Sequence, residues 1–199
     1  MLLVHGAGSG PWVFDGWAER LGDVEVEAVD LHAGLVVARA SMLNYAAAVV
    51  ARAHLLPAPV ALVGWSMGGL AALMAAERAG AERLVLLEAS PPAQVQGTNP
   101  DVTLEEGEFD PEEIYGVFPP GMPSRPESTL ARAERARGIS VATIRCPSLV
   151  AFGDEFPDDR GRRLARAYGA EELHLPGLDH WGLVGDEGAA GAVARWLLD

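Results

Sequence analysis

A serine between two glycines is the residue whose setting points most directly to chemistry. The stretch Gly64-Trp65-Ser66-Met67-Gly68 ends an apolar run and precedes an Ala- and Leu-rich segment that stops at Gly80. A strand that turns sharply into a helix at Gly-x-Ser-x-Gly exposes the serine hydroxyl, because the glycines leave room for the chain to pass close by. The amino end of the following helix favours negative charge at the same point. The sequence therefore predicts a nucleophile at Ser66.

A serine hydroxyl needs a neighbouring base to take its proton. His180 lies in Gly177-Leu178-Asp179-His180-Trp181-Gly182, a glycine-containing loop after the last apolar run, and we expect it to be this base. The other histidines have settings typical of structural residues: a strand end, helical segments, or a strand (His5, His32, His54 and His174).

Short apolar runs alternate with segments of helical period, which predicts an α/β fold with a mostly parallel sheet of about six strands flanked by helices. The predicted strands are Leu2–His5, Glu25–Val29, Val60–Gly64, Arg83–Leu87, Ser148–Phe152 and Glu172–Leu175. The predicted helices are Val13–Leu21, Leu43–Leu55, Met67–Ala79, Gly161–Tyr168 and Ala189–Leu198.

An insert at about 91–140 interrupts this alternation. Its first part, from Pro91 to about Arg125, is rich in proline and contains an acidic stretch at 105–113, so it cannot form a long helix or a central strand. We expect irregular structure and short helices outside the sheet, either a lid or a surface excursion with no role in binding. No repeat or linker divides the chain, so we expect a single domain over residues 1–199.

These features, in this order, resemble the α/β-hydrolase superfamily, and the resemblance spans almost the whole chain. His5-Gly6-Ala7-Gly8-Ser9-Gly10 resembles the family's oxyanion loop, Gly64–Gly68 resembles its nucleophile elbow, and His180 falls at its catalytic histidine. The absence of room for strands before Leu2 makes the chain similar to the minimal six-strand bacterial lipases. The resemblance implies an oxyanion hole formed by the backbone N–H groups of Met67 and Ala7.

The family's third catalytic residue is an acid that orients the histidine. Its usual place in the family, three residues after the glycine that ends a strand, is occupied here by Phe156, which cannot accept a proton. Two alternatives remain: Glu88 at the end of the preceding strand, as in some haloalkane dehalogenases, or Asp154 or Glu155 in the same turn as Phe156.

Several large side chains are candidates for a substrate pocket. Trp65 and Met67 flank the serine, and Trp12 follows the oxyanion loop, where core packing is an equal alternative. His5 is a further pocket candidate, which we interpret as a structural group that holds the oxyanion loop. No dinucleotide-binding or Walker sequence is present, and the acidic residues at 154–159 lack the calcium-loop pattern, so we expect no cofactor and no metal.

The composition limits the partners. The formal net charge is -13 and every basic residue is an arginine, so we expect neither nucleic acid nor an anionic membrane as a partner. The acidity suits solubility, or steering of a cationic substrate. A single cysteine, Cys146, and a start without signal-peptide features lead us to expect a cytoplasmic protein.

The sequence thus predicts a serine hydrolase that cleaves an ester or related acyl bond of a small, fairly apolar substrate through an acyl-enzyme on Ser66. A thioesterase, lactonase, C–C hydrolase or lyase using the same serine and histidine is one alternative. A non-enzymatic protein that binds a ligand in the same pocket is another, because fold does not fix function.

Overall fold

Six parallel strands form the central sheet of the computed structural model, which describes residues 1–21 and 24–199. The order across the sheet is β2-β1-β3-β4-β7-β8, and every pairing in it is parallel. The strands are β1 (Leu2–Val4), β2 (Glu27–Val29), β3 (Ala61–Trp65), β4 (Arg83–Leu87), β7 (Ser148–Phe152) and β8 (Glu171–His174). The predicted fold class is confirmed, and each strand lies within two residues of its predicted bounds.

The strand order changes direction between β1 and β3. From β1 the chain moves outward to β2, and then crosses back to β3 and continues in the opposite direction to β8. In open α/β sheets, ligands bind at such a switch point, outside the carboxyl ends of the strands. The loop after β1 and the turn after β3 therefore lie where this topology favours a binding site.

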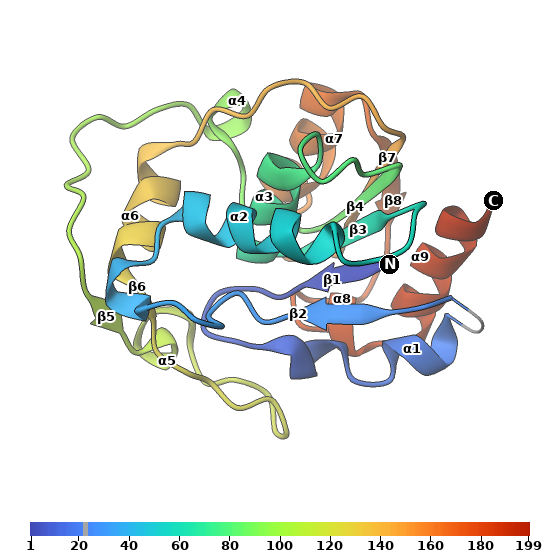
Figure 1. The fold of residues 1–199 in the computed structure, drawn as a ribbon, viewed down its shortest axis with the longest axis horizontal. Helices are drawn as coiled ribbons and strands as arrows, with labels where there is room; N and C mark the ends of the chain where they lie inside the picture. Colours follow the sequence, from blue (N-terminus) through green and yellow to red (C-terminus); the bar gives the residue numbers. More distant parts are fainter. Residues whose placement is uncertain (22–23) are drawn as a thin grey trace.

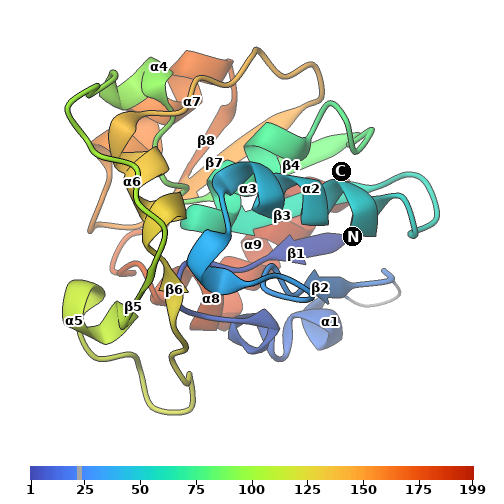
Figure 2. The same cartoon turned by 60° about the vertical axis from the view of Figure 1, so that its left-hand side comes forward.

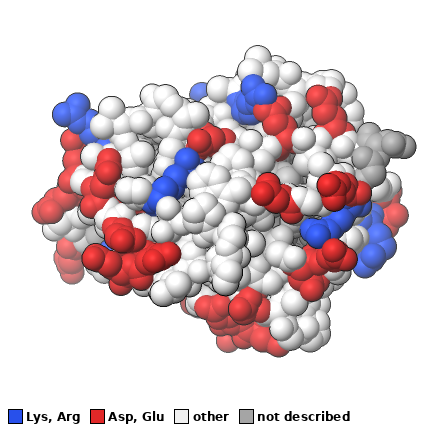
Figure 3. All heavy atoms as spheres, turned by 90° about the horizontal axis from the view of Figure 1, so that it is seen from below, with Lys and Arg blue, Asp and Glu red and all other residues white. Residues whose placement is uncertain are grey.

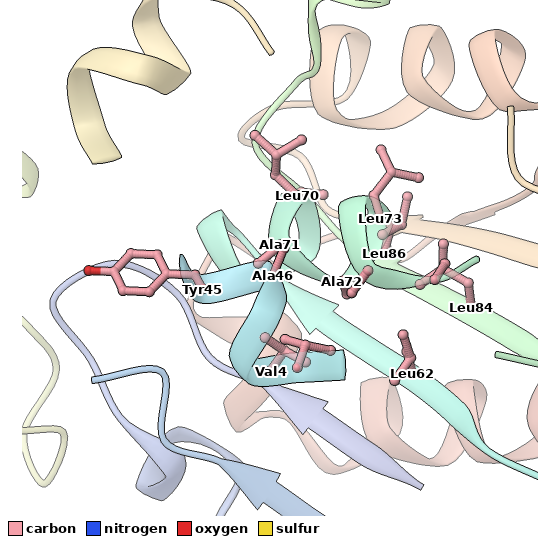
Figure 4. Packing of buried hydrophobic residues seen from close by; sticks show 14 of the residues in the cluster. Val4, Tyr45, Ala46, Leu62, Leu70, Ala71, Ala72, Leu73, Leu84 and Leu86 are labelled. Carbon is pink, nitrogen blue, oxygen red and sulfur yellow. The ribbon is translucent and has the colours of Figure 1, made fainter. Parts of the chain in front are cut away.

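Alternate residues along each strand enter separate cores on the two faces of the sheet. On one face, Leu2 and Val4 of β1 join Leu62 of β3 in a core with the helices α2, α3 and α7. Figure 4 shows part of this core, with Leu70 and Leu73 of α3 among the labelled residues. On the other face, apolar residues of the same strands pack against α1, α8 and α9. Burial on both faces explains why the strands read as short continuous apolar runs.

The helices that cover the two faces are mostly the predicted ones, and Figure 1 shows them on either side of the sheet. One layer contains α2 (Met42–Ala53), α3 (Met67–Ala75) and α7 (Arg163–Tyr168), the last preceded by a π-helical turn, η3 (Asp158–Arg162). The other contains α1 (Trp17–Arg20), α8 (Gly182–Gly185) and α9 (Glu187–Leu198). Two 3₁₀ turns, η1 (Pro11–Phe14) and η2 (Val37–Arg39), complete the set. The predicted helix Val13–Leu21 is therefore two short pieces, separated where Gly16 has a φ of 80°.

The insert is more regular than its prolines suggest. It contains α4 (Ala93–Gln96), α5 (Pro111–Tyr115) and α6 (Thr129–Arg137), together with a small antiparallel pair, β5 (Glu108–Phe109) and β6 (Glu127–Ser128). Figure 2 shows α5, α6 and this pair gathered at one end of the molecule, away from the two termini. Ser128 caps α6 by accepting a hydrogen bond from the Ala131 N–H, and this nine-residue helix follows the proline-rich part of the insert, for which we expected irregular structure and short helices.

Acidic side chains form several separate groups on the face shown in Figure 3, where basic side chains are fewer. None of the helices in the described residues combines the length and apolar content needed to cross a membrane.

Candidate active site

Ser66 sits on a strained turn between β3 and α3. Its φ is 56° and its ψ is -123°, a backbone conformation that residues with a Cβ rarely adopt. The flanking glycines are sterically required: a Cβ on Gly64 would lie 2.6 Å from the Gly68 carbonyl oxygen, and one on Gly68 would lie 2.1 Å from the His5 carbonyl oxygen. The predicted strand, sharp turn and helix are all present.

Glu88 follows β4, the strand beside β3, and is fully buried. Its φ of 39° is again unusual for a residue with a side chain. One carboxylate oxygen, Oε1, accepts a hydrogen bond from the Gly153 N–H at 2.8 Å, and the other, Oε2, lies 2.7 Å from Nδ1 of His180. The sequence left two places open for the acid, Glu88 or the turn with Asp154 and Glu155, and the structure brings Glu88 to the His180 ring.

The His180 ring is fixed by its neighbours. Because a carboxylate only accepts, Nδ1 carries the proton and donates to Glu88, which leaves Nε2 unprotonated in the neutral ring. The Trp65 ring lies 4.9 Å from the His180 ring, and the Trp65 Nε1–H donates to the His180 carbonyl oxygen at 3.0 Å. Phe156 packs edge-on against His180, with a centroid separation of 5.6 Å. The residue at the usual acid position therefore supports the imidazole by packing.

Asp154, the other candidate acid, is directed elsewhere. Its Oδ1 lies 2.8 Å from Nε2 of His174 and its Oδ2 accepts from the Gly177 N–H at 2.7 Å. These contacts, the Gly177 bond first, lower the pKa of Asp154. Glu155 reaches the backbone of the histidine instead of its ring, since Oε2 accepts from the His180 N–H at 3.0 Å. The turn that carries both acids pairs with the chain after β8, which turns Asp154 away from the His180 imidazole.

His5 holds the loop that follows β1. Nδ1 faces the Gly6 carbonyl oxygen at 2.8 Å and must donate, whereas Nε2 accepts from the Leu31 N–H at 3.1 Å. Burial lowers the pKa of His5, consistent with a neutral ring that has one donor and one acceptor nitrogen. This contact fits the structural role expected for His5.

The predicted oxyanion-hole donors lie at the two turns beside Ser66. Ala7 is in the loop after β1 and Met67 begins α3, and in the described residues neither N–H donates to another backbone carbonyl. The Met67 side chain is fully buried in the core, contrary to the expectation that it borders the pocket. Only its backbone is suited to face a substrate.

Two residues of the insert contact the same loop, and the sequence analysis did not single them out. Glu127 is fully buried and accepts hydrogen bonds from the Gly8 N–H at 2.9 Å and from the Tyr45 hydroxyl at 2.5 Å. Arg125 donates to the Ser9 carbonyl oxygen at 2.7 Å and pairs with Asp30. Their signal in the sequence is weak, because both contacts join residues more than 90 positions apart.

Hydrogen bonds outweigh burial at Glu127. Burial acts to raise the pKa of this carboxyl, but the contacts from His32, Tyr45 and Gly8 lower it to about 2. The buried group is therefore a carboxylate at neutral pH, held by partners from three other segments of the chain.

A cavity of about 290 Å³ opens over the serine and the histidine. Its lining comes from the switch-point turns, the insert and the segment after β7: Ala7, Trp65, Ser66, Ile114, Tyr115, Phe118, Arg135, Glu155, Phe156, Arg160, His180 and Trp181. This volume is near the lower end for small-molecule sites. The insert therefore borders the cavity, as expected of a lid.

Trp12 and His5, which the sequence left open between a pocket role and a structural one, lie outside this lining. The Arg125 guanidinium covers the Trp12 ring, with its carbon 5.1 Å from the ring centroid, and His5 is fully buried beneath the loop. Trp65 is the expected pocket residue that does line the cavity. Among the described residues, no cluster of His, Cys, Asp and Glu side chains is arranged to hold a metal ion.

A model of the alpha/beta hydrolase family matches residues 1–196. The chain belongs to this family. Polyneuridine aldehyde esterase has a similar structure, with a TM-score of 0.70 at 18% identity over 100% of this chain and 98% of that one. RedJ, a thioesterase from the prodiginine biosynthetic pathway in Streptomyces coelicolor, has a TM-score of 0.62 at 22% identity over 98% and 83% of the two chains. No curated protein sequence matches this hydrolase-family chain.

A third similar structure is that of LipS and LipT, described as metagenome-derived lipolytic enzymes, with a TM-score of 0.66 at 19% identity over 99% of this chain and 90% of that one. At identities this low, the likeness establishes the fold alone. The substrate of this alpha/beta hydrolase has to be argued from its own residues.

Proposed function

We propose that this alpha/beta hydrolase is a serine hydrolase that cleaves an ester or a related acyl bond of a small molecule through an acyl-enzyme on Ser66. The observation that carries the proposal is the 2.7 Å contact between Glu88 Oε2 and His180 Nδ1, beside a serine on a strained turn in the same cavity. A buried acid that fixes the tautomer of a histidine is the arrangement that activates a serine for acyl transfer.

In the first half-reaction, Ser66 Oγ attacks the carbonyl carbon while His180 Nε2 takes the hydroxyl proton. The bond between Oγ and the acyl carbon forms, and the carbonyl oxygen becomes an oxyanion that the Ala7 and Met67 N–H groups receive. A single preorganised donor of this kind lowers the barrier by about 3 to 4 kcal/mol. The imidazolium then gives its proton to the leaving alcohol, and the acyl-enzyme remains.

In the second half-reaction, water takes the place of the alcohol. His180 removes a proton from the attacking water and returns it to Ser66 Oγ as the acid product leaves. Glu88 stabilises the imidazolium in both halves, and its carboxylate is available for this because its other oxygen is held by the Gly153 N–H.

The cavity supports a small and largely apolar substrate. Aromatic and aliphatic side chains make up most of its wall, and the serine lies among them. The chemistry does not distinguish an oxygen ester from a thioester, and the similar structures include an esterase and a thioesterase. Esters and thioesters with the same acyl chain, tested side by side, will identify the leaving group.

Labelling with a fluorophosphonate probe tests the proposal. We expect covalent modification of the wild-type protein at Ser66, located by peptide mass spectrometry, and loss of labelling in Ser66→Ala and His180→Ala. His174→Ala is the matched control, because this histidine binds Asp154 instead of lining the cavity. A folded wild-type protein that is not labelled, and that turns over no activated ester or thioester, would contradict the proposal and favour a ligand-binding protein.

A further inference from the structure

Two arginines from different segments line the cavity above Ser66. Arg135 comes from α6 in the insert, and Arg160 comes from η3 after β7. Both are partly buried. The same two residues also line the neighbouring cavity, so they lie side by side at the boundary between the two hollows.

Neither arginine forms an ion pair with a carboxylate of the described residues. Arg135 donates only to neutral oxygens, among them the Tyr115 hydroxyl at 3.2 Å and Ser90 Oγ at 3.5 Å. The Arg160 guanidinium lies over the Phe156 ring, with 4.1 Å between its carbon and the ring centroid. Other arginines also lack an ion pair within the described residues, Arg137 and Arg166 among them, but those two are exposed, whereas Arg135 and Arg160 are partly buried in one cavity.

The two acids whose charges act on Arg160 already accept hydrogen bonds from the histidine segment or from Gly153. Glu155 lines the same cavity, but Oε2 binds the His180 N–H, and both oxygens of Glu88 are used beneath the imidazole. Burial lowers the pKa of Arg160 and the positive charge of Arg135 lowers it further, whereas the charges of Glu88 and Glu155 raise it; the net direction is downward. The two guanidinium groups therefore repel each other in a partly desolvated space, and an anion between them would relieve that repulsion.

We propose that Arg135 and Arg160 form a carboxylate-binding subsite. This proposal rests on the proposed function, and it makes the substrate a small ester with an apolar body and a free carboxylate. A guanidinium presents paired N–H donors that match the two oxygens of a carboxylate. The apolar side chains between the arginines and the serine, such as Ile114 and Phe118, would hold the body of the substrate. Phe156 supports this subsite in two ways. It stands where the family usually has its catalytic acid, so no carboxylate from that position pairs with Arg160, and its ring packs against the Arg160 guanidinium.

Binding to the Ser66→Ala protein provides a test that does not depend on catalysis. The ligands are monomethyl adipate and methyl adipamate, which differ only in a terminal carboxylate or carboxamide of nearly the same shape. We expect the acid to bind about tenfold more tightly than the amide in isothermal titration calorimetry, as a charge-assisted hydrogen-bonded pair predicts. Adding Arg135→Gln or Arg160→Gln should remove most of this preference.

Two exposed arginines close to this pair in the chain serve as matched controls, one on α6 with Arg135 and one on α7, the helix that follows η3. Arg137→Gln on α6 and Arg166→Gln on α7 remove the same charge from outside the cavity, and the acid preference should survive both changes. Equal affinity for acid and amide in the Ser66→Ala protein would overturn the subsite. An equal loss of preference in the control variants would also overturn the subsite, because the preference would then come from the electrostatic potential of the whole protein.

Turnover separates this proposal from the proposed function. Wild-type protein should hydrolyse an aryl ester of adipic acid with a kcat/KM about tenfold above that of the matching adipamic ester, after subtraction of the spontaneous rate. Faster hydrolysis of the neutral ester would overturn the carboxylate subsite and leave the serine hydrolase standing. If neither ester reacts and the fluorophosphonate probe does not label Ser66, the proposed function fails, and the binding measurements still decide the subsite.

Discussion

Ser66 and Glu88 share a feature that sets them apart from other residues with a side chain. Within the part of the chain that the structure describes, they are the non-glycine residues with positive φ, at 56° and 39°. Each follows the end of one of two neighbouring strands, β3 and β4. Backbone strain of this kind costs about 1 to 3 kcal/mol per residue and persists where the surrounding structure imposes it. Strain at both positions is consistent with a fold in which the direction of these two side chains was favoured at a cost in stability.

A comparison of two Ser66 variants measures this strain. Both Ser66→Gly and Ser66→Ala remove the hydroxyl, but only alanine keeps a Cβ in the unfavourable conformation. After allowance for the greater chain entropy of glycine, we expect the glycine variant to be more stable by about 0.5 to 2 kcal/mol. Urea unfolding of the two proteins gives the difference directly, and an alanine variant of equal or higher stability would contradict it.

Replacing Glu88 tests the role of its charge. Glu88→Gln keeps the shape of the side chain but presents an amide to His180 Nδ1, which favours the wrong tautomer of the ring. We expect kcat for an activated ester to fall by about 10³- to 10⁴-fold, as for other disrupted triads.

Asp154→Asn is the control for that measurement, because Asp154 contacts His174 and not the His180 ring. It should change kcat by less than about threefold. If Asp154→Asn were the more damaging of the two changes, the assignment of the acid would be reversed. Circular dichroism and thermal unfolding establish that both variants are folded.

At the scale of elements, the segment 125–128 ties the insert to the loop after β1. Glu127 and Arg125 both bind that loop, and Glu127 also reaches the Tyr45 hydroxyl on α2. A buried carboxylate with several hydrogen-bond donors is stable only while they all remain in place. The insert is therefore anchored beside the serine by polar contacts.

The pKa of Glu127 predicts how this anchor responds to acid. Its folded value of about 2 lies below the ordinary value of 4.5. The carboxylate contributes stability that is fully present above about pH 4.5 and is lost as the pH falls toward 2, on the order of 3 kcal/mol in total. The difference in unfolding free energy between wild type and Glu127→Gln should therefore be largest near neutral pH and shrink across this window.

Urea unfolding at a series of pH values measures that difference. The exposed Glu105→Gln is the control and should show a small difference at every pH. A constant gap between wild type and Glu127→Gln would mean that the amide disrupts packing, and that the charge of Glu127 is not stabilising.

The elements that local pattern determines were predictable, and the contacts between distant elements were not. The glycines around Ser66 specify the turn by sterics, and apolar runs such as Ser148–Phe152 specify buried strands. The choice of Glu88 over Asp154 depends on where two neighbouring strands end and on the pairing of the turn after β7. The partners of Arg125 and Glu127 depend on the path of the whole insert, and the local pattern of apolar and polar residues does not predict that path.

At the scale of the whole molecule, the dominant feature is the net charge of -13, visible as groups of acidic side chains in Figure 3. Like charges repel and oppose the compact state, and salt screens the repulsion. The arginine pair at the cavity is thus a local positive region in a protein that is acidic overall.

Salt should therefore stabilise the fold near neutral pH. The Debye length falls from about 30 Å at 0.01 M to about 8 Å at 0.15 M ionic strength, so most repulsion between distant surface acids is lost over this range. We expect Tm to rise when sodium chloride is raised between these values. A Tm that is unchanged or falls would indicate that local ion pairs, such as Arg20 with Glu187, outweigh the general repulsion.

The contact between the insert and the loop after β1 also bears on how this fold could be re-engineered. Inserts of this kind look like exchangeable modules, since they leave and rejoin the sheet between two neighbouring strands. Here, a graft that replaced residues 91–140 would also remove the acceptor of the Gly8 N–H, one residue from Ala7. Under the proposed mechanism, substrate range and the position of the oxyanion donor at Ala7 would therefore be linked traits, and a successful graft would have to carry its own equivalent of Glu127.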